Sequence, residues 1–107
     1  MQRLTIVRYK VKPDQVAQNE SLSKAVFDRL RSDNPAGMAY SLFKEADGKG
    51  FVHVFMNLSE DSSDLLTETP EFKAFSAGGP ERWETPPDVT RLSVVRIDSY
   101  FSSTADV

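Results

Sequence analysis

Apolar and polar positions follow two different periods along this chain. Residues 4–11 and 51–58 are rich in β-branched and aromatic side chains, which is typical of β-strands. Between them, residues 13–32 carry apolar side chains at three- and four-residue spacing, the period of a helix with one buried face. Pro13 suits the first turn of that helix, where its missing N–H is harmless. The pattern predicts a strand, then a long helix, before further strands.

Turn-forming residues mark where these elements end. The cluster at residues 33–37, Asp-Asn-Pro-Ala-Gly, predicts a helix stop, because proline cannot continue a helix and glycine tolerates positive φ. A second strand is predicted over residues 38–46. Asp47-Gly48, between this strand and the next, is a strong signal for a hairpin.

The C-terminal half predicts one more helix and one more strand. Thr69 is placed to cap a helix whose first residue is Pro70, and residues 78–80, Gly-Gly-Pro, are expected to end it. Residues 81–88 contain two consecutive prolines and predict a stiff connector. Residues 89–100 predict a long final strand.

The resulting order, βαββαβ, predicts an α+β domain of the ferredoxin-like type, in which two main helices cover one face of a four-stranded antiparallel sheet. A chain of 107 residues has room for a single domain. We place that domain at residues 1–101 and expect a polar, frayed tail at residues 102–107.

Composition narrows the classes of function. A net charge of −3 argues against a dedicated nucleic-acid binder. No apolar run approaches the roughly 18 residues of a membrane span, and the first residues lack the features of a signal peptide, so a cytoplasmic protein is expected. With no cysteine and a single histidine, the sequence predicts neither a disulfide nor a metal site.

The strand at residues 51–58 presents two different faces, because alternate side chains point to opposite sides of a sheet. We assign to the helices the wholly apolar face, which consists of Val52, Val54, Met56 and Leu58. The face left open then consists of Phe51, His53, Phe55 and Asn57. So aromatic an open face predicts a covering partner, and a homodimer with sheet packed on sheet is the simplest solution. The alternative is a monomer in which residues 59–88 cover that face.

Three segments resemble those of a known superfamily. They are residues 4–13 (LTIVRYKVKP), residues 51–55 (FVHVF) and residues 69–75 (TPEFKAF), the last lying before a long final strand. With the βαββαβ order, over residues 3–100, they resemble the dimeric α/β-barrel superfamily, and within it the antibiotic biosynthesis monooxygenase-like proteins. The resemblance implies a homodimer with a cavity between sheet and helices. For some relatives it also implies oxidation of quinols or polyketide-like phenols without metal or flavin, so no cofactor is expected.

Three charged or titratable residues are the candidates for catalysis. His53 is the candidate proton acceptor for a phenolic substrate, because the ordinary pKa of histidine lies near neutrality. The alternative is a hydrogen-bonded histidine of an interface or a cavity wall, and its place on a strand does not fit the haem-degrading relatives, whose histidine lies on a helix. Arg8 and Arg96, on strands expected to be neighbours, could hold an anion or stabilise a phenolate. The alternative for both is an ion pair with Asp98, with Glu45 or with an acidic segment of a partner.

The substrate-binding candidates are aromatic side chains that could stack on a flat ligand and an amide that could polarise a carbonyl. They are Tyr9, Tyr40, Phe51, Phe55, Asn57 and Trp83. The alternative role for the aromatics is packing in the core or an interface. Our leading hypothesis is a cofactor-independent monooxygenase that acts on a small phenolic or quinol-like molecule. The other hypotheses are a non-catalytic dimeric module that binds a small aromatic molecule or a protein, and an isomerase of muconolactone type.

Overall fold

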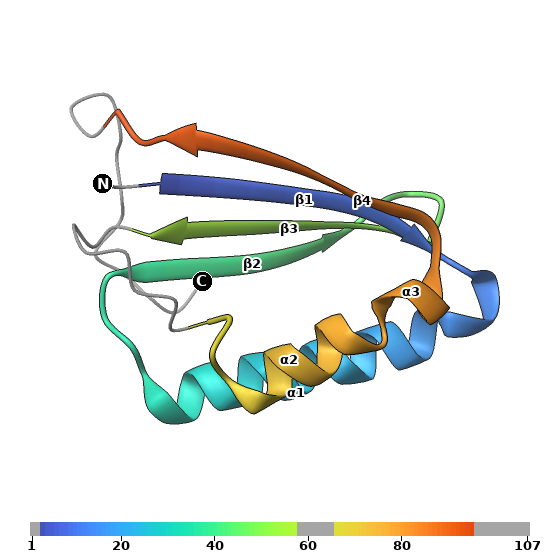
Figure 1. The fold of residues 1–107 in the computed structure, drawn as a ribbon, viewed down its shortest axis with the longest axis horizontal. Helices are drawn as coiled ribbons and strands as arrows, with labels where there is room; N and C mark the ends of the chain where they lie inside the picture. Colours follow the sequence, from blue (N-terminus) through green and yellow to red (C-terminus); the bar gives the residue numbers. More distant parts are fainter. Residues whose placement is uncertain (1–2, 58–65, 96–107) are drawn as a thin grey trace.

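The computed structural model describes residues 3–57 and 66–95. Four strands form one antiparallel sheet in the order β2-β3-β1-β4. The strands are β1 (Arg3–Val11), β2 (Met38–Lys44), β3 (Gly50–Asn57) and β4 (Trp83–Ser93). The helices are the 3-10 turn η1 (Pro13–Gln15), α1 (Val16–Asp33), α2 (Pro70–Ala77) and α3 (Gly79–Arg82). Figure 1 shows the helices together on one face of the sheet, so the predicted ferredoxin-like α+β architecture is confirmed.

The last strand differs most from its prediction. β4 begins at Trp83 rather than at Val89, and the expected connector with Pro86 and Pro87 is part of the strand. β4 is an edge strand that pairs only with β1, so a residue without an N–H is tolerated on its outer side. The β1–β4 register also shifts between Arg8 and Val11, which is the irregularity expected where prolines interrupt a ladder. The part of the predicted strand beyond residue 95 and the predicted tail lie outside the described residues.

The predicted capping signals hold at the end of α1 and at the start of α2. Pro13, expected in the first turn of the long helix, instead begins the 3-10 turn η1, and α1 starts at Val16. Asn34 takes the left-handed conformation (φ 48°) that ends α1. The Thr69 Oγ1 accepts a hydrogen bond from the Phe72 N–H at 3.2 Å, as expected for the cap of α2. Gly79 does not lead into a loop but begins α3. A Cβ at Gly79 would lie 2.3 Å from the Cζ2 of Trp83, so the indole ring rests directly on the backbone there.

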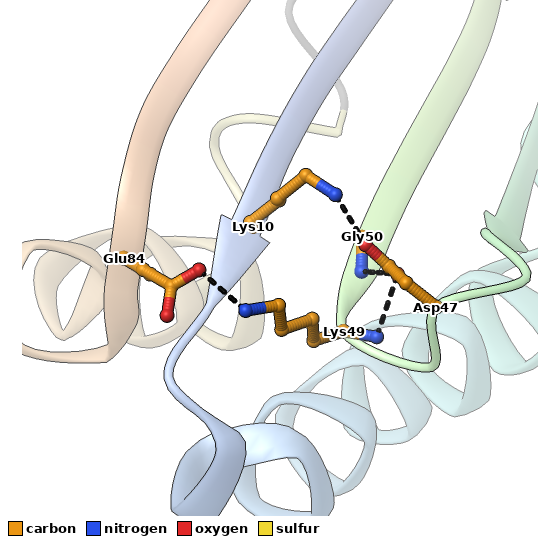
Figure 2. A network of polar contacts seen from close by, with 5 residues as sticks. All are labelled: Lys10, Asp47, Lys49, Gly50 and Glu84. Carbon is orange, nitrogen blue, oxygen red and sulfur yellow. Dashed lines mark hydrogen bonds and ion pairs between the residues drawn. The ribbon is translucent and has the colours of Figure 1, made fainter.

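One carboxylate holds the β2–β3 hairpin. Asp47 accepts hydrogen bonds from the backbone N–H groups of Lys49 (3.0 Å) and Gly50 (2.8 Å). It also pairs with the ammonium group of Lys10 on β1, and Lys49 pairs with Glu84 of β4 at 2.7 Å, as Figure 2 shows. Lys10 and the two backbone donors hold the pKa of Asp47 well below its usual range. The predicted hairpin is confirmed, and its ion pairs join it to the two strands beyond β3.

The two sheet faces are the reverse of those assigned from the sequence. Phe51 and His53 of β3 are 1% and 5% exposed, whereas Val52 and Val54 are only half-buried. The imidazole packs against the ring of Phe75 on α2, with centroids 5.5 Å apart, so this face lies under the helices. The assignment was wrong because polar side chains are buried readily when they are hydrogen-bonded, and an apolar list alone does not identify the inner face.

The aromatic face of β3 is therefore covered by helices of the same chain. α2 lies within residues 59–88, the segment named in the monomer alternative. Phe51 and Phe55 therefore cannot form the predicted dimer contact. Phe51 is buried in the core, and Phe55 is half-buried on the side of the sheet that the helices cover. The outward face carries other apolar side chains, among them Phe43, which is 54% exposed.

Two kinds of feature are absent from the described residues. No helix there is both long and apolar enough to cross a membrane. Over the same residues, no three His, Asp or Glu side chains gather as a metal ion would require.

We expect Phe51→Ala to lower the free energy of unfolding by about 3–5 kcal/mol, because it empties a fully packed position under the helices. Phe43→Ala removes the same side chain from the outward face, where it is 54% exposed in the single chain, and should cost a monomer much less, about 1 kcal/mol or below. Urea denaturation followed by circular dichroism, at a protein concentration low enough to keep the chains monomeric, measures both. A loss for Phe43→Ala that equals or exceeds that for Phe51→Ala would contradict the face assignment.

Candidate functional site

A cavity of about 480 Å³ lies between the sheet and α2. All four strands contribute to its walls, together with α2 and residues 66–67. Ring-bearing side chains converge on it: Tyr9, Tyr40, His53, Phe55, Phe72, Phe75 and Trp83. A cavity of this size, with apolar walls and few polar groups, is typical of a site for a small organic molecule.

His53 lies between two tyrosine hydroxyls in the wall of this cavity. Its Nδ1 is 2.5 Å from the Tyr40 Oη, and its Nε2 is 2.7 Å from the Tyr9 Oη. The sheet produces this arrangement: His53 is paired with Leu42 on β2 and Val7 on β1, and each tyrosine is two residues along its strand from that partner. Such diagonal positions on one face bring long side chains within reach of each other.

The hydrogen-bonded chain continues from Tyr9 into the helices. Asn19 of α1 donates from Nδ2 to the Tyr9 Oη at 3.0 Å, and Arg82 of α3 donates from Nε to the Asn19 Oδ1 at 3.1 Å. Arg82 also donates from Nη2 to the carbonyl oxygen of Phe75 at 2.6 Å and lies 4.7 Å above that ring. Asn19 and Arg82 are 0% and 3% exposed, so a line of polar groups crosses the core to the cavity.

Burial sets the protonation states along this line. It lowers the pKa of His53 to about 4. It raises the pKa of Tyr9 to about 12, and it raises the pKa of Tyr40 as well. At neutral pH the imidazole and both phenols are therefore neutral, while the Arg82 guanidinium keeps its charge although burial lowers its pKa. A neutral imidazole whose two nitrogens are already bonded is a poor proton acceptor for a phenol.

Two arginines bring positive charge to the cavity. In the β1–β4 register Arg91 faces Thr5 and Arg3 faces Ser93, so the two arginines are diagonal neighbours on adjacent strands. Both line the cavity, and both are exposed. Two guanidiniums in this arrangement can hold an anionic group at the cavity wall.

The structure brings five of the candidate residues together at the cavity. These are Tyr9, Tyr40, His53, Phe55 and Trp83. Phe51 stacks on Tyr9 in the core, with centroids 5.9 Å apart, and Asn57 is buried; neither lines the cavity. Arg8 is exposed on the outward face of β1. Arg96 lies outside the described residues.

Three arginines and one asparagine of the site were not among the sequence candidates. They are Arg3, Asn19, Arg82 and Arg91. Asn19 lies three residues after Val16 and four before Ser23, and that spacing along the buried stripe of α1 is the signal that could have marked it. Arg82 lies where a short helix meets a strand, so no periodicity in the sequence reveals that it is buried.

No known family model and no curated protein matches the sequence. Solved structures do match. The Mycobacterium tuberculosis protein Rv0793 is 24% identical, with 92% of this chain and 100% of that chain covered and a TM-score of 0.75. A candidate antibiotic biosynthesis monooxygenase from Caulobacter crescentus is 20% identical, covering 89% of this chain and 91% of that one, with a TM-score of 0.74. Another, from Nitrosomonas europaea, is 15% identical, with coverage of 89% and 91% and a TM-score of 0.73.

These likenesses place the chain among small α+β proteins of ferredoxin-like architecture. Within that class it has the fold of the antibiotic biosynthesis monooxygenase-like proteins, so the resemblance found in the sequence is confirmed at the level of fold. At identities of 15% to 24% the chemistry has to be argued from the cavity itself.

We expect the stability of the protein to fall as the pH drops from about 6.5 toward 4. The pKa of His53 in the folded protein, about 4, lies below the ordinary value of 6.5 for histidine, so the unfolded chain takes up a proton first as the pH falls. The contribution is fully present above pH 6.5, and about 3 kcal/mol of it is lost on the way to pH 4. Urea denaturation at a series of pH values measures this loss.

His53→Gln is the control, because it removes the group that titrates in this window. Its stability should vary less between pH 6.5 and 4 than that of the wild type. Since the chain has one histidine, an NMR titration reads the same group directly. A midpoint near 6.5 would contradict the burial argument.

Proposed function

We propose that this protein is a cofactor-independent monooxygenase that oxidises a small phenolic or quinol-like molecule in the cavity beneath α2. The observation that carries the proposal is the cavity itself: about 480 Å³ with aromatic walls, buried tyrosine hydroxyls and two arginines. Structural neighbours described as candidate antibiotic biosynthesis monooxygenases support the same class of reaction.

In this chemistry the substrate itself supplies the electrons. A ring CH₂ group becomes a carbonyl, or a quinol CH group becomes C–OH while the quinol itself is oxidised to the quinone. In both cases one atom of O₂ enters the product, and the other leaves as water with the two hydrogens that the substrate loses. The protein has to bind the aromatic ring, stabilise the electron-rich anion that reacts with oxygen, and exclude water. Phe55, Phe72 and Trp83 supply the walls for the first and third of these tasks.

The roles of the charged residues change from those expected from the sequence. Arg3 and Arg91 are the anion stabilisers in this proposal, since they line the cavity and Arg8 does not. For Arg96 the role stays a prediction. His53 serves as a link between two hydroxyls rather than as a general base, because both ring nitrogens are engaged.

A non-catalytic binding module is the second candidate. It is favoured by the same engagement of His53, because the described cavity wall then offers no free base. The two candidates differ in one respect that can be measured: an oxygenase consumes O₂ when its ligand is present, and a binding module does not.

We expect oxygen uptake when the protein is mixed with a panel of quinols and hydroxyanthrones. Arg91→Gln should lower kcat/KM by about tenfold or more, because it removes a charge that stabilises the anion. Arg31→Gln, on the exposed side of α1, is the matched control and should leave the rate unchanged. Tight binding of panel members without oxygen uptake would overturn the oxygenase and favour the binding module.

We further propose that two copies pair through the outward face of the sheet. The central strands contribute Leu4, Ile6, Val52, Val54 and Met56 to that face, all half-buried in the single chain. The edge strands add Phe43 and Leu92, which are 54% and 49% exposed. Together these side chains form one apolar surface across all four strands. Isolated apolar residues are common on protein surfaces, but a contiguous apolar surface of this extent is typical of an interface between subunits. A twofold contact uses the same surface on both copies.

Sedimentation at micromolar concentration tests this pairing. We expect the wild type to sediment at twice the chain mass of 12.0 kDa. Val54→Glu should shift it to the monomer, because it places a carboxylate in the middle of the apolar contact. Lys24→Glu, on the exposed side of α1, should remain dimeric. A wild-type monomer at this concentration would overturn the pairing.

A further inference from the structure

We infer that Tyr40 is the hydrogen-bond donor to the bound ligand, and that four buried polar residues turn its proton toward the cavity: Arg82, Asn19, Tyr9 and His53. The site then selects aromatic ligands that present an acceptor oxygen, either a carbonyl or a phenolate. The inference rests on the proposed function, since it names what the same cavity selects.

The order of donors begins at Arg82. A guanidinium has only donors, so the atom of Asn19 that faces it has to be the carbonyl oxygen. This fixes the amide orientation, and the NH₂ group of Asn19 is left to face Tyr9. Arg82 itself has little freedom to move, because its second donor is held by the Phe75 carbonyl oxygen at 2.6 Å.

The order continues through Tyr9 to His53. The Tyr9 oxygen accepts from Asn19, and its own proton needs an acceptor in the buried wall. The Nε2 of His53, 2.7 Å away, is that acceptor. With Nε2 as an acceptor, the neutral imidazole carries its proton on Nδ1.

The last link leaves one proton free. Nδ1–H of His53 donates to the Tyr40 Oη at 2.5 Å, so the Tyr40 hydroxyl does not need to donate back. Among the described residues, His53 is the hydrogen-bond partner of that hydroxyl. Tyr40 lines the cavity, so its own proton is available to a ligand there. Tyr9 also lines the cavity but is only 4% exposed, whereas Tyr40 is half-buried. The opposite order would leave the free proton on the more buried hydroxyl, which is the costlier arrangement.

The tautomer of His53 is the first test, because it does not depend on a ligand. In ¹⁵N-labelled protein at pH 7, the single histidine should show a protonated Nδ1 and an unprotonated Nε2 in long-range ¹H–¹⁵N spectra. A protonated Nε2 would overturn the order of donors, whatever the cavity binds.

Binding of a matched pair of probes is the second test. 1-Indanone and indane share one hydrocarbon skeleton, and only indanone has an acceptor oxygen. The wild type should bind indanone about five- to tenfold more tightly, as one hydrogen bond allows. Tyr40→Phe should lower that preference to near unity and leave indane binding nearly unchanged, because the ring that forms the wall is retained.

A third variant tests whether the preference for indanone depends on the order of donors or only on the packing of Tyr40, because it reverses that order. Asn19→Asp replaces the amide donor by a carboxylate that accepts from both Arg82 and Tyr9. His53 then has to donate from Nε2 to Tyr9, its Nδ1 becomes an acceptor, and the Tyr40 proton turns away from the cavity. We expect the tautomer to change to Nε2–H and the preference for indanone to be lost, although Tyr40 is still present.

The outcomes distinguish this inference from the proposed function. Equal binding of both probes by the wild type overturns the donor role of Tyr40 but leaves the aromatic cavity in place. Failure of both probes to bind overturns the proposed site, and the donor role with it. Should Asn19→Asp not fold, the wild-type tautomer and the Tyr40→Phe comparison still decide the question.

Discussion

A guanidinium inside the protein is the constraint on which the rest of this structure depends. Arg82 is 3% exposed, and two of its donors are bonded, Nε to the side chain of Asn19 and Nη2 to the backbone of Phe75. A buried charge is tolerated only when its donors are bonded, so the packing of α1, α2 and α3 cannot change independently. The hydrogen bonds at the cavity wall depend on Arg82 as well, because the Asn19 amide that accepts from Arg82 also donates to Tyr9, which is bonded to His53.

Most of the fold could be predicted from local signals. Asp47 closes the hairpin, Thr69 caps α2, and the apolar stripe of residues 13–32 forms the long helix, because each of these depends on near neighbours in the chain. The start of β4 could not be predicted in this way. Its prolines forbid an interior strand, and only the sheet order shows that β4 lies at an edge, where prolines are tolerated.

The candidate site was harder to predict, because burial of polar groups is a tertiary property. His53 and its aromatic neighbours were identified from the sequence, but they were placed on the outward face. What decides the face is hydrogen bonding to Tyr9 and Tyr40, residues 44 and 13 positions away. The locations of the arginines could not be predicted for the same reason. Arg82 is buried, Arg91 lines the cavity, and Arg8 lies on the opposite face, but their neighbours in the sequence do not distinguish these three places.

The close approach of Trp83 to Gly79 has a consequence for ligand size. The indole forms one wall of the cavity and rests on a backbone position where a side chain would collide with it. The position of this wall therefore depends on the absence of a side chain at Gly79, a residue that does not line the cavity. Exchange of that glycine for alanine in a homologue would displace the indole and reshape this wall, so the range of molecules accepted could change without any substitution among the residues that touch them.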